Sequence, residues 1–475
     1  MQPIATLSIA KSLDNIMQYS PRPKREHVAR SFKLVSAACH LFLKSRGINT
    51  VIALFLLVSA AFAQDWFGFN THYKQGDPFS VFNPLVLKYS GAIIRDEIGW
   101  GDVETSKGVY SMPSLAAKWI NSAAANGVKV DVLLNFPCPG YPNAPIYPDP
   151  FDPVQYGKMA GALAGFLKAY QNVVAIEILN EPNNQYQSVE GPTWKDKYPI
   201  LFNDAYAAIK AANPNIQIIG IGAQGDDNFY ILSKLTHLDG FTDHPYAAFY
   251  VPENSYEPPY NSAPDSYRAY VAAIRANTKA PIWETEWGIG SDSTEYEQAL
   301  FTVRRLLLSA GVGIEHTIIY QFWDQSSGTQ GVLKYHGAPK RSALMIQRVV
   351  PLLNGKTPLP GSVTVEPTGS IDSADLFTEF FADNLSSVAA CWIGNHDPNT
   401  ANYMSYGATI VFPQRNHFRV TALDPMTGAT WTPKFTVGKD KITVSNIQIT
   451  NVPILYIAEY KLRWQRKYQK SGAIR

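Results

Sequence analysis

The sequence predicts a (β/α)8 TIM barrel, an α/β fold, with a small C-terminal antiparallel β-domain. Between residue 65 and about residue 355, eight short apolar runs alternate with longer amphipathic segments, the pattern of parallel strands joined by crossover helices. Eight such units in roughly 290 residues match the usual size of a closed barrel. After residue 360, short alternating runs are separated by Gly, Pro, Asn and Asp, which is typical of antiparallel strands.

The barrel strands are expected at the eight apolar runs. In order, these runs are 66–73, 92–98, 128–136, 173–179, 216–221, 240–242, 281–285 and 314–322. The helix-like stretches between them are 113–126, 153–170, 194–212, 264–277 and 294–310. Two of these stretches run into a glycine, at Gly127 and Gly311, as helix C-termini often do. An open doubly wound sheet is the structural alternative, but no Gly-x-Gly-x-x-Gly follows the first run.

The strand-like runs of the second domain are 362–365, 409–412, 418–423, 442–449 and 454–460. We therefore divide the chain into a catalytic barrel at 64–357, a β-sandwich-like domain at 358–462 and a basic tail at 463–475. No linker of low complexity separates the two domains, so we expect them to pack against each other. The tail is expected to be a frayed end.

Residues 1–63 have the features of a secretory signal peptide with a long basic leader. The first 50 residues carry eight Lys/Arg against two acidic residues, and the uncharged run 51–63 ends in Ala61-Phe62-Ala63. That run is short for a membrane span, and small residues at the first and third places of its last triplet suit signal peptidase. We expect cleavage after Ala63 and a secreted or periplasmic protein. The alternative is an uncleaved anchor, the one case in which this chain would contact a membrane.

The charge distribution disfavours a nucleic-acid partner. The formal net charge is +2, but the first 50 residues contribute +6 and the last 15 residues contribute +6, so the body between them is acidic. Binding to phosphates requires a basic surface. A content of 46% hydrophobic and 17% charged residues indicates a globular protein.

Cysteine and histidine usage predicts neither a metal site nor a cofactor. Cys39 lies in the leader, and Cys138 and Cys391 are far apart in the sequence. They allow one disulfide, but two isolated buried thiols are the expectation. No cysteine pair has zinc spacing, and no His-x-His or His-x-x-x-His pair occurs.

Two polar strand ends are the strongest candidates for an active site, because a barrel of this kind places catalytic residues where its strands end. Glu181 follows the fourth apolar run, and Glu286 ends the seventh, 105 residues later. These strands lie nearly across the barrel from each other, so both carboxylates can reach one cleft. Glycoside cleavage requires two such carboxylates. We expect Glu181 to be the acid, with a pKa raised by its surroundings, and Glu286 to be an ionised nucleophile.

Five motifs in one order across residues 90–325 resemble clan A of the glycoside hydrolases, most closely family 39 and its bacterial relatives. They are Arg95-Asp96-Glu97-Ile98-Gly99-Trp100, Asn180-Glu181-Pro182-Asn183, Asp243-His244-Pro245-Tyr246, Thr285-Glu286-Trp287-Gly288 and Gln321-Phe322-Trp323. One departure is Leu179, which stands where many clan members have an aromatic residue.

The resemblance implies roles for the residues around the two carboxylates. Arg95 and Tyr246 would donate hydrogen bonds to Glu286, and Asn180 would bind the 2-hydroxyl of the sugar. His244 would hold the site in place, although a lone histidine is as often a packed core residue. The remaining candidates for substrate binding are Trp100, Asn135, Trp287 and Trp323, with buried core aromatics as the alternative for the tryptophans.

These observations predict an O-glycosyl hydrolase that retains anomeric configuration and cleaves β-glycosidic bonds of an extracellular poly- or oligosaccharide. The alternative from another class is a barrel that binds carbohydrate without cleaving it. A metal-dependent hydrolase on the same fold is disfavoured by the lack of paired histidines.

Overall fold

The computed structural model describes residues 66–141, 143–222, 227–247, 251–255, 265–289, 293–325, 329–369, 375–394, 405–414 and 417–460. The signal peptide expected at 1–63 and the basic tail expected at 463–475 lie outside these residues. The described residues belong to one compact unit that spans Ala63–Arg475.

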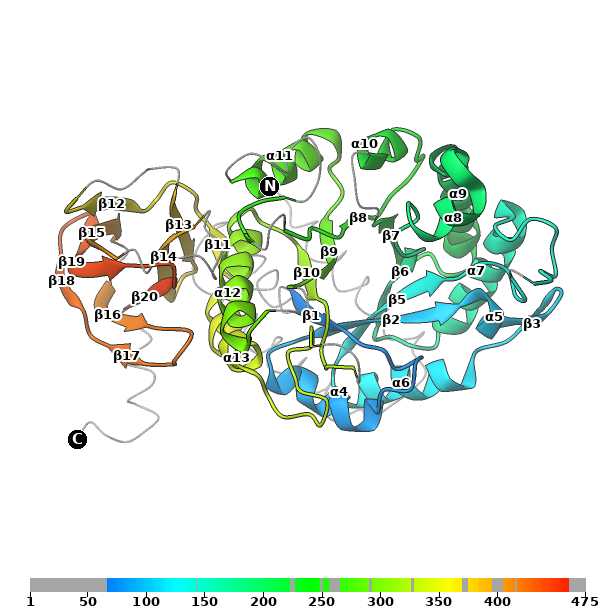
Figure 1. Ribbon diagram of the computed structural model, residues 1–475, viewed down its shortest axis with the longest axis horizontal. Coiled ribbons are helices and arrows are strands. Elements are labelled where there is room, and N and C mark those ends of the chain that lie inside the picture. The colour runs from blue at the N-terminus through cyan, green and yellow to red at the C-terminus, as the bar shows by residue number, and fades with distance from the viewer. Residues whose placement is uncertain are drawn as a thin grey trace, which may run out of the picture. The chain divides into compact units, whose positions relative to one another are not determined.

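Eight parallel strands close into a barrel, as the sequence predicts (Figure 1). In sequence order they are β1 (Phe67–Asn70), β2 (Ile93–Gly99), β5 (Lys129–Asn135), β6 (Val173–Ile178), β7 (Gln217–Ile221), β8 (Gly240–Asp243), β9 (Ile282–Trp287) and β10 (His316–Ile319). Strand β1 pairs in parallel with both β2 and β10, which closes the sheet. Each strand falls on one of the eight apolar runs.

The helices α4 (Phe79–Lys88), α6 (Ser114–Ala125), α7 (Pro153–Leu167), α9 (Trp194–Ala212), α10 (Asp227–Leu232), α11 (Ser266–Asn277), α12 (Glu295–Gly311) and α13 (Arg341–Leu353) surround the barrel (Figure 1). Shorter elements in the connections are α5 (Trp100–Val103), β3 (Glu104–Ser106), β4 (Val109–Tyr110), α8 (Gln185–Glu190) and the 3-10 turn η1 (Gly191–Thr193). Local sequence explains where two helices begin. Asp152 caps α7, with Pro153 at its first position, and Thr294 and Glu297 form a capping box on α12.

The barrel interior is apolar toward the amino-terminal ends of its strands and polar toward their carboxyl ends. Ile93, Ala175, Ile219, Trp283 and Ile318 form a separate core cluster inside the barrel. Side chains alternate along a strand, so the residues two places further on face the same interior. In β2 and β6 these residues are charged, and this polar layer forms the floor of the candidate site.

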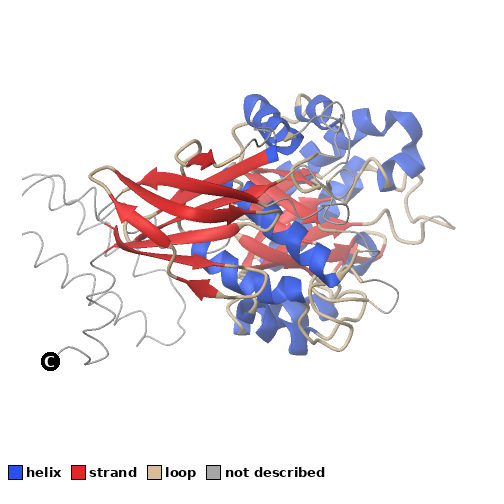
Figure 2. Cartoon of the chain, turned by 60° about the vertical axis from the view of Figure 1, so that its left-hand side comes forward, coloured by secondary structure: helices blue, strands red, loops and turns tan. Residues whose placement is uncertain are grey.

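The C-terminal domain is a sandwich of two antiparallel sheets, as predicted (Figure 2). One sheet has the order β11 (Thr357–Pro358), β13 (Leu376–Ala382), β14 (Ser386–Ile393), β20 (Ile454–Tyr460), β16 (His417–Leu423) and β17 (Thr430–Trp431). The other has the order β12 (Thr364–Pro367), β15 (Tyr406–Pro413), β19 (Lys441–Ile449) and β18 (Lys434–Val437). The sequence did not predict strands β13 and β14. Every residue of β14 is buried, so this strand lacks the alternation that marks a half-exposed strand.

The sandwich packs against the barrel without a linker. Trp392 of β14 belongs to the main barrel core, and its Nε1 donates to Oε1 of Glu253 at 2.8 Å. Arg304 of α12 also donates through Nε to this oxygen, at 2.7 Å. A second contact joins Arg268 Nη2 to Glu379 Oε1 at 2.6 Å, and burial raises the pKa of Glu379 to about 7. The two domains therefore share buried polar contacts as well as apolar surface.

Cys138 and Cys391 are both buried and unpaired, which confirms the expectation of two isolated thiols. Within the described ranges, every helix is too short or too polar to cross a bilayer.

Candidate active site

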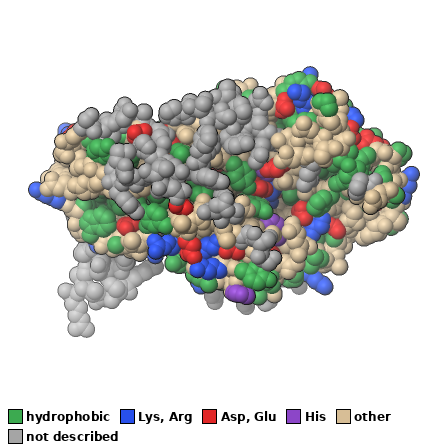
Figure 3. All heavy atoms as spheres, viewed as in Figure 1, with side chains coloured by type: hydrophobic (Ala, Val, Ile, Leu, Met, Phe, Trp, Pro, Cys, Tyr) green, Lys and Arg blue, Asp and Glu red, His purple; other side chains and the backbone are tan. Residues whose placement is uncertain are grey.

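A cavity of about 240 Å³ opens at the carboxyl ends of the barrel strands. Its walls come from β1, β2, β5, β9 and the segments after β1, β5, β6 and β10. They include Glu97, Asn135, Asn180 and Glu286. On the face drawn in Figure 3, acidic and basic side chains are interspersed rather than gathered into one basic surface.

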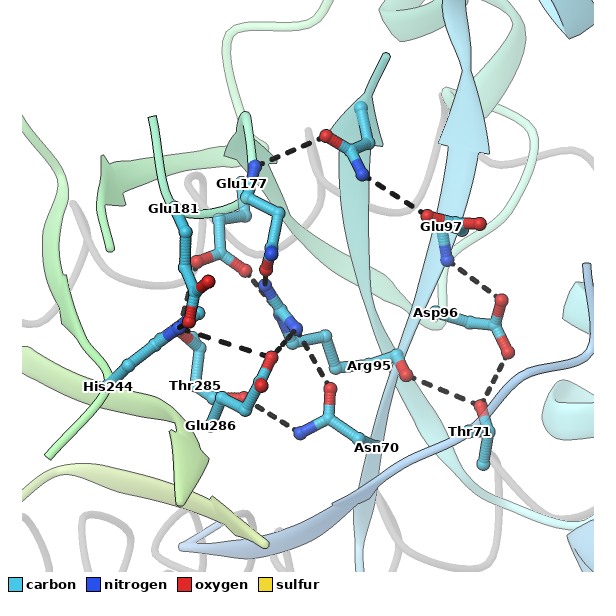
Figure 4. A network of polar contacts seen from close by, with 12 residues as sticks. Asn70, Thr71, Arg95, Asp96, Glu97, Glu177, Glu181, His244, Thr285 and Glu286 are labelled. Atoms are coloured by element: carbon cyan, nitrogen blue, oxygen red, sulfur yellow. Dashed lines mark hydrogen bonds and ion pairs between the residues drawn. The ribbon is translucent and has the colours of Figure 1, made fainter. Parts of the chain in front are cut away.

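The two candidate carboxylates approach each other over this cavity (Figure 4). One carboxylate oxygen of Glu181, one of Glu286 and a ring nitrogen of His244 all lie within 4.8 Å of one another. Their strands, β6 and β9, are separated in the barrel by β7 and β8. Leu179 and Glu181 both have positive φ angles, of 62° and 39°. Residues other than glycine rarely adopt this backbone conformation, and it recurs at functional sites. This sharp turn at the end of β6 carries Glu181 over the cavity.

A β-bulge in β9 presents two successive side chains to the interior. Thr317 of β10 pairs with Glu284 and Ile319 with Trp287, so Thr285 and Glu286 oppose a single residue of β10. Thr285 Oγ1 donates to Oε1 of Glu177 at 2.9 Å, and Glu286 faces Arg95. Regular alternation would have turned one of these two side chains away from the site.

Arg95 is the centre of the polar network and is 3% exposed. Its Nε donates to Glu177 Oε2 at 2.5 Å, Nη1 to Asn70 Oδ1 at 2.9 Å and to Glu286 Oε2 at 3.1 Å, and Nη2 to Asn180 Oδ1 at 2.8 Å. Burial alone would lower the pKa of Arg95, but the carboxylates of Glu177 and Glu286 outweigh this effect and raise the pKa above its ordinary value. The guanidinium therefore stays charged and orients groups from β1, β6 and β9.

Both oxygens of Glu286 accept a hydrogen bond. Tyr246 donates its hydroxyl to Oε1 at 2.7 Å, while Arg95 occupies Oε2. Burial, followed by the charge of Glu286, holds the pKa of Tyr246 well above its usual range, so the phenol keeps its proton. Glu286 is thereby held in one orientation.

Glu181 differs from the expectation of a raised pKa. Burial raises its pKa, but the hydrogen bond and charge of His244 and the hydrogen bond from Asn184 together lower it. His244 Nδ1 lies 3.0 Å from Oε1 of Glu181, and Asn184 Nδ2 donates to Oε2 at 2.8 Å. Burial disfavours the charge on His244, but the carboxylates of Glu286 and Glu181 raise its pKa above 6.5. Between pH 4.5 and 6.5 the ligand-free pair is therefore ionic, with the proton on His244.

Asn135 and Asn180 both line the cavity. The backbone N–H of Asn180 donates to Oδ1 of Asn135 at 3.3 Å, and Nδ2 of Asn135 donates to Oε2 of Glu97 at 3.2 Å. This chain of contacts ties the ends of β2, β5 and β6 together on one side of the cavity.

The structure does not bring the three predicted tryptophans to the cavity. Trp100 and Trp287 are fully buried, and their indole N–H groups donate to Glu104 at 2.6 Å and to Thr317 at 2.7 Å. Trp323 packs edge-on against Phe82, with ring centroids 4.2 Å apart. A buried indole offers no face to a sugar ring, so the core alternative describes Trp100 and Trp287 better.

Sequence reasoning missed several residues that line the cavity or support it. They are Asn70, His72, Glu177 and Tyr320. Strand β10 ends at Ile319, so the aromatic residue at its end is Tyr320 and not Trp323. Glu177 carried a usable signal, because a charge inside an apolar run must be paired, and Arg95 is such a charge in another run. Burial and the charge of Arg95 lower the pKa of His72 to about 4, so this ring is neutral.

Glu181, His244 and Glu286 are also close enough to share a metal ion. The partners already described argue against that use. His244 Nδ1 is engaged by Glu181, and the Arg95 guanidinium already supplies a positive charge 3.1 Å from Glu286. A second cation there would be repelled.

Comparisons with known proteins agree with the barrel fold. The sequence model of the family described as cellulase (glycosyl hydrolase family 5) matches residues 59–327. This family belongs to clan A, as does the family 39 of the resemblance noted from the sequence. A search of curated proteins finds no match.

Similar solved structures include a family 39 glycoside hydrolase from the gut symbiont Bacteroides cellulosilyticus WH2, with a TM-score of 0.64 and 21% identity over 84% of this chain and 82% of that chain. The GH39 enzyme from Xanthomonas axonopodis pv. citri has a TM-score of 0.57 and 14% identity, covering 83% and 94% of the two chains. A monomeric beta-xylosidase from Caulobacter crescentus CB15 has a TM-score of 0.56 and 14% identity, covering 84% and 96%. These structures share the fold of this chain.

Proposed function

The chain belongs to the cellulase family, glycosyl hydrolase family 5, and on that premise we propose a retaining β-glycosidase that cleaves an extracellular poly- or oligosaccharide. Glu286 is the nucleophile, and Glu181 is the acid and base. One observation carries the proposal, the approach of their carboxylate oxygens to within 4.8 Å. Retaining glycosidases place these groups about 5–5.5 Å apart, whereas inverting enzymes need about 6.5–9.5 Å to admit a water.

In the first step, Glu286 attacks the anomeric carbon and Glu181 protonates the departing oxygen. Arg95 and Tyr246 keep the attacking carboxylate in one orientation, which reduces the entropy lost in reaching the transition state. Arg95 also donates to Oδ1 of Asn180. The amide of Asn180 is thereby oriented so that its nitrogen can donate to the sugar 2-hydroxyl, a bond that strengthens in the transition state.

The proton for the departing oxygen comes from the pair formed by Glu181 and His244. Before substrate binds, His244 holds this proton and Glu181 is ionised. A sugar that fills the cavity displaces water and so disfavours the charged pair. Transfer of the proton from Nδ1 of His244 to Oε1 of Glu181, across 3.0 Å, leaves two neutral groups, and Glu181 then acts as the acid.

In the second step, Glu181 has lost its proton and removes one from a water molecule. That water attacks the anomeric carbon of the glycosyl-enzyme and releases Glu286. The sugar leaves with its original configuration because both steps invert the same carbon.

The test uses Glu181→Ala, Glu286→Ala and, as a matched control, Glu295→Ala, whose carboxylate pairs with Lys334 away from the cavity. Reducing ends are measured on a panel of polysaccharides, and products are measured from activated aryl β-glycosides with azide. We expect both active-site variants to lose turnover of natural substrate, and the control to keep it. The Glu181 variant should form a β-glycosyl azide, because its nucleophile remains.

A β-glycosyl azide from the Glu286 variant would contradict the assignment of roles. Binding of glycans by the unsubstituted protein without release of reducing ends would instead support the non-catalytic carbohydrate-binding barrel.

The extracellular location is a separate part of the proposal and rests on the signal-like residues 1–63. Expression of the full chain should yield protein outside the cytoplasm with Gln64 as its first residue, measured by N-terminal sequencing. Retention of the leader on membrane-bound protein would support an uncleaved anchor.

A further inference from the structure

The ring of His244 has a second nitrogen, Nε2, that takes no part in the proton transfer to Glu181. Nδ1 faces Glu181 at 3.0 Å (Figure 4). Nε2 is buried on the opposite edge of the ring, and no hydrogen-bond partner for it exists within the described part of the chain. Buried polar atoms are nearly always hydrogen-bonded, either to protein or to an ordered water. The surroundings of Nε2 therefore indicate what holds this edge of the ring.

Two further polar atoms lie close to Nε2 in the barrel interior. A Cβ atom added to Gly222, the residue after β7, would lie 3.0 Å from Thr242 Oγ1 and 3.2 Å from Glu177 Oε1. The same Cβ atom would lie 3.6 Å from His244 Nε2. Thr242 and Glu177 are both fully buried, and Thr242 Oγ1 is unpartnered among the described residues. Three polar atoms thus converge on the space that the absent side chain of Gly222 leaves.

A single water molecule matches the chemistry of these three atoms. Buried waters typically make about three hydrogen bonds to buried polar groups. Such a water can accept from Nε2–H, donate to Glu177 Oε1 and form its third bond with the Thr242 hydroxyl, which can donate or accept. Glu177 Oε1 already accepts from Thr285 at 2.9 Å, but a carboxylate oxygen has a second lone pair.

We propose that a buried water bound by His244, Thr242 and Glu177 holds the Nε2 proton of His244, so that the Nδ1 proton is the one passed to Glu181. The proposal rests on the proposed glycosidase function and adds Thr242 and Gly222 as positioning residues behind the acid. It identifies a ligand site for water inside the barrel wall, separate from the sugar cavity.

The proton balance of the acid step follows from this arrangement. The bond between Nδ1 and its proton breaks, and a bond between that proton and Oε1 of Glu181 forms. The Nε2–H bond stays intact, so the ring becomes a neutral imidazole protonated on Nε2. The hydrogen bond at one ring nitrogen fixes which nitrogen carries the proton. After Glu181 has taken a proton from the attacking water, it returns that proton to Nδ1.

Loss of the Nε2 proton would stop this transfer. The ring would then keep its remaining proton on Nδ1 and donate it to an ionised Glu181, which cannot act as an acid. Among the described residues, the charged groups that face the ring are Glu181, Glu286 and Arg95, and Glu177 reaches it through the water. The carboxylates favour a charged ring, whereas Arg95 disfavours it. A weaker bond at Nε2 therefore makes the ring lose its charge at a lower pH.

The experiment uses substitutions behind the ring that leave His244 and both catalytic carboxylates in place. Thr242→Val removes the hydroxyl and keeps the shape of the side chain, whereas Thr242→Ser keeps the hydroxyl. Gly222→Ala places a methyl group in the space between the three atoms. The control is Thr302→Val on α12, where the hydroxyl is also buried but donates to the carbonyl oxygen of Gln298 at 2.6 Å.

Two aryl β-glycosides of the same sugar separate proton supply from other effects. A dinitrophenol departs as a stable anion and needs little protonation, whereas plain phenol depends on the acid. We expect Thr242→Val to lower kcat/KM for the phenyl glycoside by roughly three- to tenfold, the contribution of one hydrogen bond. The value for the dinitrophenyl glycoside should change by about twofold at most.

The alkaline limb of the phenyl glycoside profile should also move to lower pH in Thr242→Val. Gly222→Ala should show the same selective loss, while Thr242→Ser and Thr302→Val should behave like the unsubstituted enzyme. A crystal structure of the unsubstituted protein that shows ordered waters should contain one within hydrogen-bonding distance of Nε2, Oγ1 and Oε1.

A crystal structure with no water bound to these three atoms would overturn the proposal. Equal losses for both glycosides in Thr242→Val, or no loss for either, would also overturn it while leaving the proposed function in place. Failure of the unsubstituted protein to cleave either glycoside, together with a negative polysaccharide panel, would instead overturn the proposed function and the proton transfer with it.

Discussion

Replacement of Arg95 by methionine is expected to lower the free energy of unfolding by about 3–5 kcal/mol, the usual cost of removing one partner from a buried ion pair. Arg95 and Glu177 have side-chain exposures of 4% and 0%, so water cannot solvate the carboxylate that remains. Methionine fills a similar volume but donates no hydrogen bond. The four contacts of the guanidinium would all be lost.

The size of the effect depends on the uncompensated charge and not on lost packing. Among the described residues, the remaining hydrogen bond to Glu177 is the one from Thr285, at 2.9 Å. Neutralising this carboxylate in the double variant Arg95→Met/Glu177→Gln should therefore recover part of the lost stability. The stability of Arg95→Lys should lie between that of Arg95→Met and that of the unsubstituted protein. Lysine keeps the positive charge, but its ammonium is a point charge without the planar fork of arginine.

Urea unfolding followed by tryptophan fluorescence measures these free energies for the unsubstituted protein, for the single variants Arg95→Met and Glu177→Gln, and for the double variant. A double-mutant cycle then isolates the coupling between Arg95 and Glu177. A loss below about 1 kcal/mol in Arg95→Met, or a double variant less stable than Arg95→Met, would show that the guanidinium does not stabilise this charge.

Three further predictions follow from the same contacts. The carboxylates of Glu286 and Glu181 raise the pKa of His244, so its ring keeps the proton of the pair to a higher pH than a free histidine would; in His244→Ala only Glu181 can carry this proton, so the alkaline limb of the kcat/KM–pH profile should move to lower pH, and an unmoved limb would exclude the shared proton. Trp392→Phe removes the 2.8 Å donor to the buried Glu253 and should lower stability by about 1.5–3 kcal/mol, measured by urea unfolding, with aryl-glycoside kcat unchanged; an unchanged stability would mean that this contact contributes little. Treatment with a chelator should leave the rate of glycoside cleavage unchanged, and a loss restored by a divalent metal would support a metal hydrolase.

Local sequence accounts for most of the fold. The eight apolar runs became the eight barrel strands, because a parallel strand buried on both faces must be apolar along its length. The alternating runs after residue 360 became strands of the sandwich for the converse reason, since one face of such a strand is exposed. Strand β14 was not recognised because the barrel covers its outer face, so that all its residues are buried.

Local sequence likewise predicts one part of the candidate site and misses another. The positions of Glu181, Glu286, Arg95 and Asn180 follow from strand ends and motifs, which depend only on neighbours in the chain. Tyr320 was missed, and Trp323 was chosen in its place, because the last residue of β10 is set by pairing with β9 and β1.

The amino-acid order was sufficient for the barrel, the sandwich and the two opposed carboxylates, because strand periodicity and motif spacing are local properties of the chain. Three features depended on the folded molecule: the burial of Trp100 and Trp287, the lowered pKa of Glu181, and the β-bulge that turns both Thr285 and Glu286 inward. Each of them arises from side chains or strands distant in the chain, and no local pattern encodes the solvation or the partner that a residue acquires when such segments meet.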